Sequence, residues 1–382
     1  MRTIFYVGHY SGLNNPNNFT ITPSINSKMD YLISVINRLN FNLVIFSLGC
    51  STAPPISFKR ESITETDSKT KYIFISSFNF LFEFVSRIWL YLQVVNLILF
   101  RISKEDIVVV YHSLHLSRII NFLKPFRKFT LIFEVEEIYS AVLEKGEGFI
   151  NNEIRSLMNA NGYILVNDLL ANKMKITNKP YVVCYGSYVR ASESVDSLSH
   201  NTIHLVYAGY LGGKESDLSL ALETIILLPN NYSLNILGYG DSRDVNILLD
   251  RIEQINLTCG REKVKYHGCL FGEEYSRFLR SCHIGLSTRV LSNKYSDYTF
   301  PSKILVYLAN NLIPVSPRLS CISESRIADR IVFYNDSNPQ SVVAAILNIE
   351  FRDNGNSNID LISKLDTEFL DDLKHMLSND TN

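Results

Sequence analysis

The 382-residue sequence has almost no net charge, because 37 Lys and Arg residues oppose 38 Asp and Glu residues. Proteins that bind nucleic acid through its phosphates usually carry a strong positive charge, so nucleic-acid binding is not expected. Disorder is not expected either, since 46% of the residues are hydrophobic and only 20% are charged. The length suits two domains, each with its own core.

Cysteine motifs and targeting signals are also lacking. The six cysteines show no Cys-x-x-Cys spacing, so we expect no metal site, no disulfide framework and free thiols in a reducing cytoplasm. The first residues carry one charge and an apolar run too short for a signal peptide. They predict instead a strand over residues 3–7 that enters a turn with Gly8, His9 and Gly12, where backbone could approach a ligand.

What the sequence does have is a regular alternation of apolar strand-like and amphipathic helix-like segments. This order predicts an α/β fold with doubly wound parallel sheets. The polar, serine-rich segment 187–201 is a plausible linker. We therefore expect domains at 1–186 and 187–350, followed by a C-terminal segment, 351–382, with an amphipathic helix over Asp360–Leu377. The polar stretch Ser51–Lys71, with two prolines, is expected to be a long surface loop.

The first half is basic and the second acidic, with net charges of +5 for residues 1–185 and −6 for residues 186–382. Such asymmetry suggests that one domain faces an anionic partner. The apolar run Phe78–Phe100 is interrupted by charged and amide residues, so a transmembrane span, core helices and a helix at the membrane surface all stay open. The basic and aromatic run Lys124–Phe129 is either a solvated turn or a contact with anionic lipid.

Two predicted strands of the first half end in chemically capable residues. Ile107–Tyr111 runs into His112, and Thr130–Phe133 runs into three glutamates, Glu134, Glu136 and Glu137. Ligand sites in open α/β sheets lie at the carboxyl ends of the strands. The glutamates are either a solvated helix start or groups that work in proton transfer, and His112 is either structural or part of the site.

The second half opens with a glycine turn that contains Gly209, Gly212, Gly213 and Lys214. This turn is not Gly-x-Gly-x-x-Gly and no acidic residue follows at the ribose-binding distance, so nicotinamide binding is not expected. Glycines followed by a lysine suit an anion, although a plain strand-to-helix loop is the alternative. Gly238 and Gly240 form the matching turn after the next strand.

A second lysine stands where a helix is expected to begin, in Phe300-Pro301-Ser302-Lys303. A cation in the first helical turn opposes the helix dipole unless an anion binds there. Lys303 is therefore either a tolerated surface lysine or a phosphate ligand.

The run Tyr298–Val315, with Phe-Pro-Ser-Lys ahead of Tyr-Leu-Ala and a Pro-Val strand, resembles the donor-site helix of GT-B glycosyltransferases. It is similar in particular to the group 1 (family 4-like) enzymes that build bacterial surface polysaccharides. The resemblance implies two facing Rossmann-like domains with a cleft between them. It also implies a UDP- or GDP-linked sugar donor and a hexosyltransferase site without cofactor or metal, which the lack of an Asp-x-Asp motif fits.

The resemblance also assigns roles to residues. The diphosphate would meet Lys214 and Lys303, and the segment with His267 and Gly268 would read the base. Donor-binding residues are then Gly209, Gly212, Gly213, Lys214, Gly238, Gly240, His267, Gly268, Ser302 and Lys303. Candidate catalytic residues are Glu137, Glu134, Glu136 and His112, and the acceptor or diphosphate loop is Gly8, His9 and Gly12. Val306 stands where the family usually has a ribose-binding glutamate.

We therefore expect a glycosyltransferase that extends a lipid-linked saccharide in bacterial capsule, O-antigen or exopolysaccharide synthesis. It would be cytoplasmic and peripheral on the inner face of the cytoplasmic membrane, in contact with anionic lipid. A catalytically silent GT-B protein that acts as a binding or assembly partner is the alternative, and Val306 supports it. A sugar-nucleotide epimerase is less favoured, because its soluble substrate does not require the apolar Phe78–Phe100 region. Retention and inversion of configuration both stay open.

Overall fold

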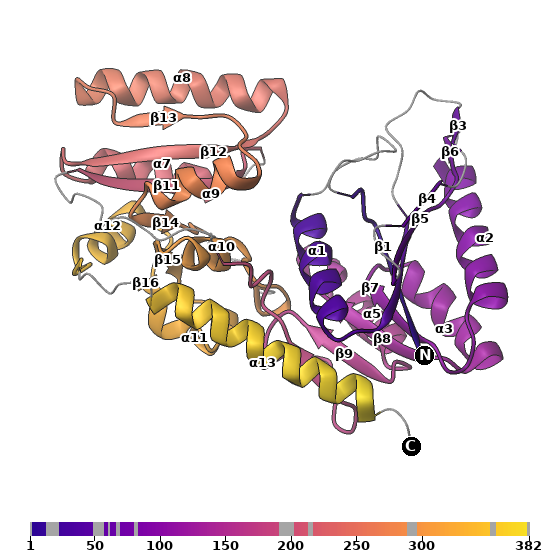
Figure 1. Ribbon diagram of the computed structural model, residues 1–382. Helices are drawn as coiled ribbons and strands as arrows, with labels where there is room; N and C mark the ends of the chain where they lie inside the picture. Colours follow the sequence, from indigo (N-terminus) through magenta and orange to yellow (C-terminus); the bar gives the residue numbers. More distant parts are fainter. Residues whose placement is uncertain are drawn as a thin grey trace. The chain divides into compact units, whose positions relative to one another are not determined.

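The computed structural model describes residues 2–12, 23–48, 57–59, 62–65, 69–79, 83–190, 202–212, 217–288, 296–351 and 357–379. The chain divides into two compact units (Figure 1). Unit 1 comprises Met1–Ser187, Tyr298–Phe300 and Glu368–Asn382, and unit 2 comprises Tyr188–Asp297 and Pro301–Thr367.

Unit 1 is built on an eight-stranded sheet in which every neighbouring pair is parallel except β4 with β5. Its strands β1, β7 and β8 are almost entirely buried, as expected for parallel strands covered on both faces. In the spatial order β10-β9-β8-β7-β1-β2-β5-β4, the strands are β1 (Thr3–Gly8), β2 (Asn42–Ser47), β4 (Ser62–Glu65), β5 (Thr70–Phe74), β7 (Ile107–Tyr111), β8 (Thr130–Val135), β9 (Gly162–Leu165) and β10 (Tyr181–Val183).

Helices cover both faces of this sheet. The chain leaves β1 toward β2 and leaves β7 toward β8 in opposite directions, so right-handed crossovers put their helices on opposite faces. Figure 1 shows α1 on one side and α2 with α3 on the other. The helices of unit 1 are α1 (Pro23–Arg38), α2 (Glu83–Arg101), α3 (Leu116–Arg127), α4 (Tyr139–Val142), α5 (Glu147–Leu157) and α6 (Leu169–Lys173).

The expected loop Ser51–Lys71 is wrong where the structure describes it. Strand β3 (Ser57–Lys59) pairs with β6 (Ser77–Asn79), and β4 adds an antiparallel edge to β5. The β-branched pair Ile63 and Thr64 favours an extended backbone. A short, polar strand is a common way to end a sheet, and its low hydrophobicity hid it among loop residues.

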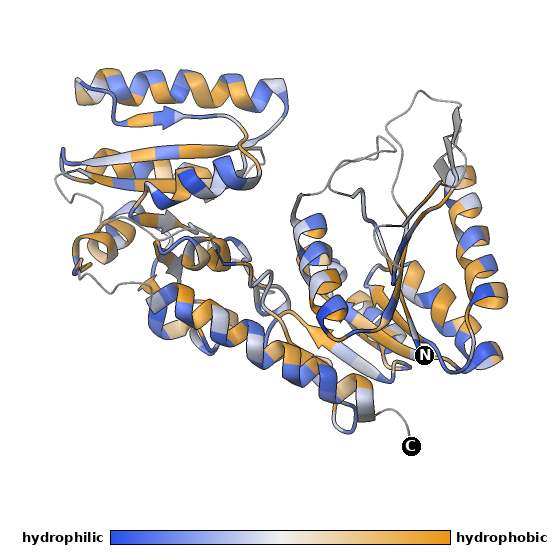
Figure 2. Cartoon of the chain, viewed as in Figure 1, coloured by the Kyte–Doolittle hydropathy of each residue, from blue (hydrophilic) through white to orange (hydrophobic). Residues whose placement is uncertain are grey.

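Unit 2 is a six-stranded, wholly parallel sheet with its main apolar core beneath α7, α8 and α12. Figure 2 shows apolar residues along its inner strands. In the order β13-β12-β11-β14-β15-β16, the strands are β11 (Ile203–Tyr210), β12 (Tyr232–Tyr239), β13 (Val264–Tyr266), β14 (Ile284–Leu286), β15 (Ile313–Pro317) and β16 (Val332–Tyr334). The helices are α7 (Asp217–Leu227), α8 (Ser242–Cys259), α9 (Gly272–Arg280), α10 (Lys303–Ala309), α11 (Ser320–Ser323) and α12 (Pro339–Leu347), with short 3₁₀ turns at Ser296–Tyr298 and Ala328–Arg330. The predicted doubly wound α/β fold is confirmed in both units.

The last helix, α13 (Ser357–Asn379), confirms the expected amphipathic helix over Asp360–Leu377. Its residues up to Thr367 group with unit 2, where Asn358 donates a hydrogen bond to the carbonyl of Leu312 at 3.3 Å. From Glu368 onward it groups with unit 1, where the Phe369 ring lies 6.0 Å from that of Tyr31.

The apolar run Phe78–Phe100 forms β6 and most of α2. By length and composition alone, α2 is the one helix among the described residues that could cross a membrane, and 17% of its window Phe84–Arg101 is buried. The helix is two-sided, because Val94, Leu97 and Ile98 are buried whereas other large apolar side chains are exposed.

Candidate active site

Both sheets gather the predicted site residues at the carboxyl ends of their strands. In unit 1, β1 ends at Gly8, β7 ends one residue before His112, and β8 contains Glu134. Tyr111 of β7 pairs in register with Glu134, and His112 N–H donates to the Glu134 carbonyl at 2.9 Å. The structure therefore brings the candidate acceptor loop, the histidine and the acidic run to one edge of this sheet.

Glu134 is fully buried at this edge. The Tyr6 hydroxyl donates a hydrogen bond to its Oε2, and its Oε1 has no hydrogen-bond partner among the described residues. Burial, and then the nearby Glu136, raise the pKa of Glu134 to about 8, against the opposing influence of Lys28 and Tyr6. Glu134 therefore keeps its proton to a higher pH than an ordinary glutamate does.

Glu136 is half-buried and pairs with a buried lysine, Lys28 of α1, at 3.1 Å. Lys28 Nζ also donates to the carbonyl of Cys184 at 2.7 Å. Burial by itself would lower the pKa of Lys28, but Cys184, Glu136 and Glu134 together raise it above its ordinary value. The charged Lys28 thus lies close to Glu134 and Glu136, and it links α1 to the acidic run at the end of β8.

Glu137 is half-buried just before α4, so its side chain is accessible from solvent. The next residue, Ile138, donates its N–H to the carbonyl of Tyr298 at 3.2 Å, which attaches this loop to the segment Tyr298–Phe300 within unit 1. Of the three glutamates, Glu136 and Glu137 present solvent-accessible side chains, and Glu134 does not.

His112 is buried and both of its ring nitrogens are engaged. Nδ1 is hydrogen-bonded to Ser117 Oγ at 2.9 Å, and Nε2 donates to Glu153 Oε1 at 2.8 Å. Glu153 in turn accepts the N–H groups of Tyr139 and Ser140 at 2.9 and 2.7 Å. The histidine therefore joins β7, α3 and the start of α4, and its catalytic role stays a prediction.

The loop after β1 is compact. The Gly8 carbonyl accepts the N–H groups of Tyr10 and Leu48, and a Cβ at Gly8 would lie 2.9 Å from Met29 Cε and 3.0 Å from Tyr111 Cβ. Gly12 has a φ of 77°, a left-handed conformation that favours glycine. His9 is half-buried, and burial lowers its pKa below the ordinary value. Nothing in this loop tests the predicted acceptor or diphosphate contact.

In unit 2, two of the predicted glycines face each other across neighbouring strands. Gly209 of β11 pairs in register with Gly238 of β12. A Cβ at Gly238 would lie 1.9 Å from the carbonyl oxygen of Gly209, and the φ of Gly238 is 154°. Only glycine fits this close approach, so the sheet edge presents bare backbone where a ligand could approach.

Lys303 lies beside Gly209, one member of this pair. Its Nζ is 4.4 Å from the centre of the Tyr207 ring and would be 3.5 Å from a Cβ at Gly209. The neighbouring predicted residue, Ser302, is exposed and precedes α10 without a side-chain capping hydrogen bond. The structure therefore places Lys303 next to the Gly209 turn, a proximity that the sequence could only suggest.

Tyr307 holds α10, and with it Lys303, against the sheet. Its hydroxyl donates to the Leu286 carbonyl and accepts the Ala208 N–H, both at 3.1 Å. A Cβ at Gly285 would lie 2.2 Å from Tyr307 Cγ, so the ring packs directly on the strand backbone. This packing, together with the buried side chains of Ile304, Leu305 and Leu308, positions the seven-residue helix.

A carboxylate in the first turn of α8, that of Asp244, also faces the glycine turn. Asp244 Oδ2 would be 2.0 Å from a Cβ at Gly212, and Asp244 Cβ would be 3.2 Å from one at Gly240. Asp241 caps the same helix by accepting the Asp244 N–H at 2.8 Å. A Cβ at Gly212 would therefore displace the Asp244 carboxylate, and one at Gly240 would be a tight contact with the first turn of α8.

His267 and Gly268 follow β13 at the same edge. His267 Nε2 donates to Asn235 Oδ1 at 2.9 Å and its ring lies 4.5 Å from that of Phe278. The Gly268 carbonyl accepts the Gly238 N–H at 2.9 Å, so this segment is tied to the glycine pair. Val306 is half-buried against an apolar cluster around Tyr307 and Leu279.

Gly213 and Lys214 lie outside the described residues, so the second predicted lysine cannot be placed. Among the residues that the structure does describe, no group of three or more His, Cys, Asp or Glu side chains is arranged to hold a metal ion. Metal independence stays a prediction.

Sequence reasoning missed Lys28 and Tyr207. In the sequence, Lys28 looks like a solvated lysine and Tyr207 looks like an ordinary strand residue. Neither carries a local signal, because each acquires its role from residues distant in the sequence.

No protein-family model and no curated protein matches the chain. Solved structures do match it over nearly its whole length. A trehalose-6-phosphate synthase, OtsA, matches with a TM-score of 0.70 at 10% identity, covering 99% of this chain and 97% of that one. An α,α-trehalose-phosphate synthase (UDP-forming) from Burkholderia xenovorans, in complex with glucose-6-phosphate, gives 0.65 at 10% identity, with 99% and 98% covered.

Anabaena Alr3699/HepE in complex with UDP gives a TM-score of 0.61 at 10% identity, again with 99% and 98% of the two chains covered. At such low identity the match concerns the fold and not the chemistry. These neighbours are GT-B glycosyltransferases, and their agreement with both sheets shows that this chain has the GT-B fold of two Rossmann-like domains.

Proposed function

We propose that this protein is a glycosyltransferase that moves a sugar from a UDP- or GDP-linked donor to a lipid-linked saccharide. The observation that carries the proposal is the position of Lys303 Nζ beside the Gly209 turn, at the carboxyl edge of the unit 2 sheet. A cation over bare backbone suits a diphosphate, which gains charge as the glycosyl bond breaks.

Two solved neighbours support this choice of ligand. Alr3699/HepE was crystallised with UDP, and the Burkholderia xenovorans synthase is described as UDP-forming. Both have the fold of this chain, and nucleotides bind such sheets at the carboxyl ends of their strands. No metal is required in this proposal, because Lys303 supplies positive charge to the leaving diphosphate.

The acceptor side of the proposal belongs to unit 1. Glu137 is accessible at the edge that also holds Glu136 and Lys28, so it is our candidate to meet the acceptor hydroxyl or the sugar. The resemblance to group 1 enzymes supports a product in capsule, O-antigen or exopolysaccharide synthesis. The exposed apolar and basic side chains of α2 and α3 support a peripheral position on the inner face of the cytoplasmic membrane.

The proposal is tested by thermal denaturation with a panel of UDP- and GDP-sugars, followed by transfer or hydrolysis assays with whichever binds. A ligand at 100 times its Kd should stabilise the protein by about 2.7 kcal/mol. We expect one base to stabilise and the other to have little effect. If no nucleotide sugar stabilises the protein or is consumed, the proposal is wrong.

A catalytically silent GT-B protein is the second candidate, and Val306 favours it. This apolar side chain stands where the resembling family usually offers a ribose-binding glutamate, and here it packs against an apolar cluster. A catalytically silent protein would bind a nucleoside diphosphate but would consume no sugar nucleotide when a lipid extract that contains acceptor is present. Turnover by the wild type that disappears in Lys303→Ala would exclude it.

A further inference from the structure

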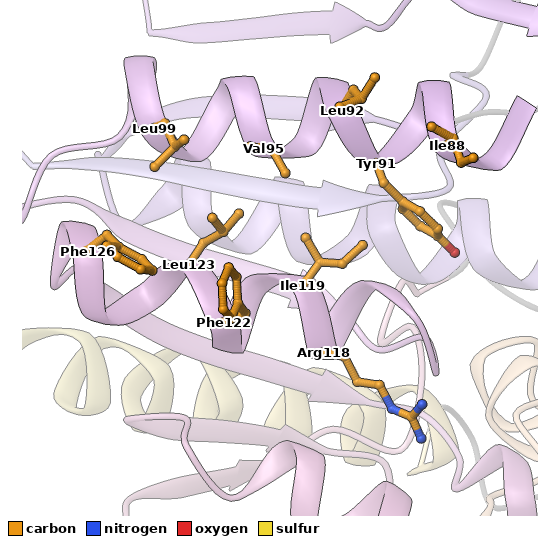
Figure 3. A pocket seen from close by; sticks show the side chains of 10 residues that line it. All are labelled: Ile88, Tyr91, Leu92, Val95, Leu99, Arg118, Ile119, Phe122, Leu123 and Phe126. Carbon is orange, nitrogen blue, oxygen red and sulfur yellow. The ribbon is translucent and has the colours of Figure 1, made fainter. Parts of the chain in front are cut away.

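An open groove runs along unit 1 between α2 and α3 (Figure 3). Its volume is about 640 Å³, within the range of small-molecule pockets. Nine of its ten described lining side chains are aliphatic or aromatic, and the tenth is Arg118. The aliphatic and aromatic walls include Ile88, Leu92 and Val95 of α2 and Ile119, Phe122 and Phe126 of α3.

The two ends of the groove differ. Figure 3 shows Leu99 and Phe126 at one end, and Tyr91 with Arg118 at the other. The Tyr91 ring lies 6.4 Å from that of His115, which immediately precedes α3. Since α3 follows β7, this polar end lies toward the carboxyl edge of the sheet, where the acidic run also lies.

The groove is bordered by unusually exposed apolar side chains. Phe122 and Phe126 are 70% and 66% exposed, and Leu92 is 57% exposed. Large apolar side chains that lie exposed on one face often mark an interaction site. The two helices carry five basic residues and one acidic residue, so a second copy of this face would be repelled and an anionic partner attracted.

We infer that this groove binds the hydrocarbon chain of the lipid-linked acceptor, with its phosphate at the Arg118 end; the inference rests on the proposed function. A single-chain amphiphile with an anionic head matches an apolar groove with Arg118 at one end, where the guanidinium extends beyond the apolar lining and away from α2 (Figure 3). Contact with a bilayer surface alone would explain the exposed apolar side chains beside the groove, but not the groove itself. The head of a chain seated this way would lie toward the edge that holds Glu136 and Glu137.

The direct test is calorimetric titration of the full-length protein with farnesyl phosphate below its aggregation concentration. We expect saturable binding, and none with isopentenyl phosphate, which has the same head on a short chain. Trp89, the one tryptophan of the chain, lies on α2 and donates to the Ser76 carbonyl at 3.1 Å. Its fluorescence should change along the same binding curve, which locates the ligand beside α2.

Matched variants distinguish binding inside the groove from binding to the exposed apolar side chains around it. Val95→Phe fills the groove, and Leu92→Glu puts a charge in it without overpacking. Each substitution should weaken farnesyl phosphate binding at least tenfold. Phe100→Ser removes an apolar side chain that is 78% exposed and does not line the groove, so binding should be unchanged. Arg118→Glu should weaken farnesyl phosphate about tenfold but leave farnesol unaffected, whereas Lys128→Glu, the same charge change beyond the other end of α3, should have little effect.

The inference is overturned if the binding of farnesyl phosphate does not saturate. It is also overturned if Val95→Phe and Leu92→Glu both bind farnesyl phosphate as tightly as the wild type does. It is also overturned if the protein binds anionic phospholipid vesicles through Phe100 while farnesyl phosphate binding is absent, since the occupant is then the bilayer. UDP titration keeps the two proposals apart. Normal UDP binding without farnesyl phosphate binding contradicts only the groove assignment. Farnesyl phosphate binding without any nucleotide binding contradicts the proposed function and, with it, the acceptor role of the bound lipid, but leaves the groove as a site for a prenyl phosphate.

Discussion

The side chain on which the proposed donor site most depends is Lys303. Replacing it with alanine removes the cation over the Gly209 turn without disturbing the Tyr307 contacts that hold α10. We expect nucleoside diphosphate binding to weaken by about 1.5–3 kcal/mol, the range for a charge-assisted hydrogen bond, and nucleoside binding to stay nearly unchanged. Calorimetry with both ligands measures the difference.

Lys265→Ala is the matched control, because Lys265 is an exposed lysine of the same unit that pairs only loosely with Glu262, at 3.9 Å. Its nucleotide affinity should equal that of the wild type. Equal losses for nucleoside and nucleoside diphosphate in Lys303→Ala would mean that Lys303 does not contact phosphate.

At the scale of elements, the loop from β8 to α4 concentrates the candidate catalytic groups. Individual Glu→Gln substitutions at Glu134, Glu136 and Glu137 should show which one works on substrate. A working general base is worth about 10²–10⁴ in rate, so one variant should lose that much turnover while its donor affinity changes little. From its accessibility we expect Glu137 to be that residue.

Glu144→Gln, an exposed glutamate just beyond the same loop, should keep full activity. Initial rates of transfer and donor Kd values, measured on folded variants, decide the assignment. If all three loop variants transfer sugar at nearly the wild-type rate, these carboxylates are structural.

Elements with strong periodicity could be predicted closely, and those formed by tertiary contacts could not. The strand Ile107–Tyr111 was predicted with the bounds that the structure has, because an uninterrupted run of β-branched residues favours a buried strand. The edge strand Ser62–Glu65 is polar and exists through its partner β5. Likewise, Lys124 and Arg127 look like solvated cations in sequence, yet they donate to the carbonyls of Asn159 and Ile102.

The candidate site follows the same rule. The glycine turns and Lys303 could be found because backbone that must approach a ligand requires glycine at set positions after strands. Lys28 and Tyr207 could not, since their roles depend on contacts across the fold.

For the whole molecule, the buried carboxyl of Glu134 predicts a pH dependence of stability. Its pKa is raised to about 8 in the folded protein, mainly by burial, whereas an unfolded glutamate titrates near 4.3. Between these values the folded state holds a proton that the unfolded state releases, so this contribution to stability is full below about pH 4 and is lost as pH rises toward 8.

The Glu134→Gln variant mimics the protonated carboxyl, so its stability should not show this loss as the pH rises. Relative to the variant, the wild type should become less stable between pH 5 and 8, by no more than about 1.4 kcal/mol per pH unit. Thermal melting of both proteins across that range measures it, and Glu144→Gln should follow the wild type. Parallel wild-type and Glu134→Gln curves would show that Glu134 is ionised in the folded protein.

The whole chain also shows how far fold and sequence can separate. Neighbours at 10% identity share two sheets and their connections over nearly all of this chain. What persists is the alternation of buried strands and amphipathic helices, whereas chemistry resides in a few side chains at the strand ends. This explains why the fold could be predicted from patterns and the substrate could not.

The contact between Lys303 and the Tyr207 ring has a consequence for the entropy of binding. A lysine side chain that moves freely in solvent loses rotamer freedom when it contacts a ligand, and this loss costs about 0.5–1.5 kcal/mol of binding free energy. Here the ammonium already lies 4.4 Å from the ring centre, directly beside the glycine turn. Much of that ordering is therefore complete before any ligand arrives, so the diphosphate that we propose would meet a cation that is already in place.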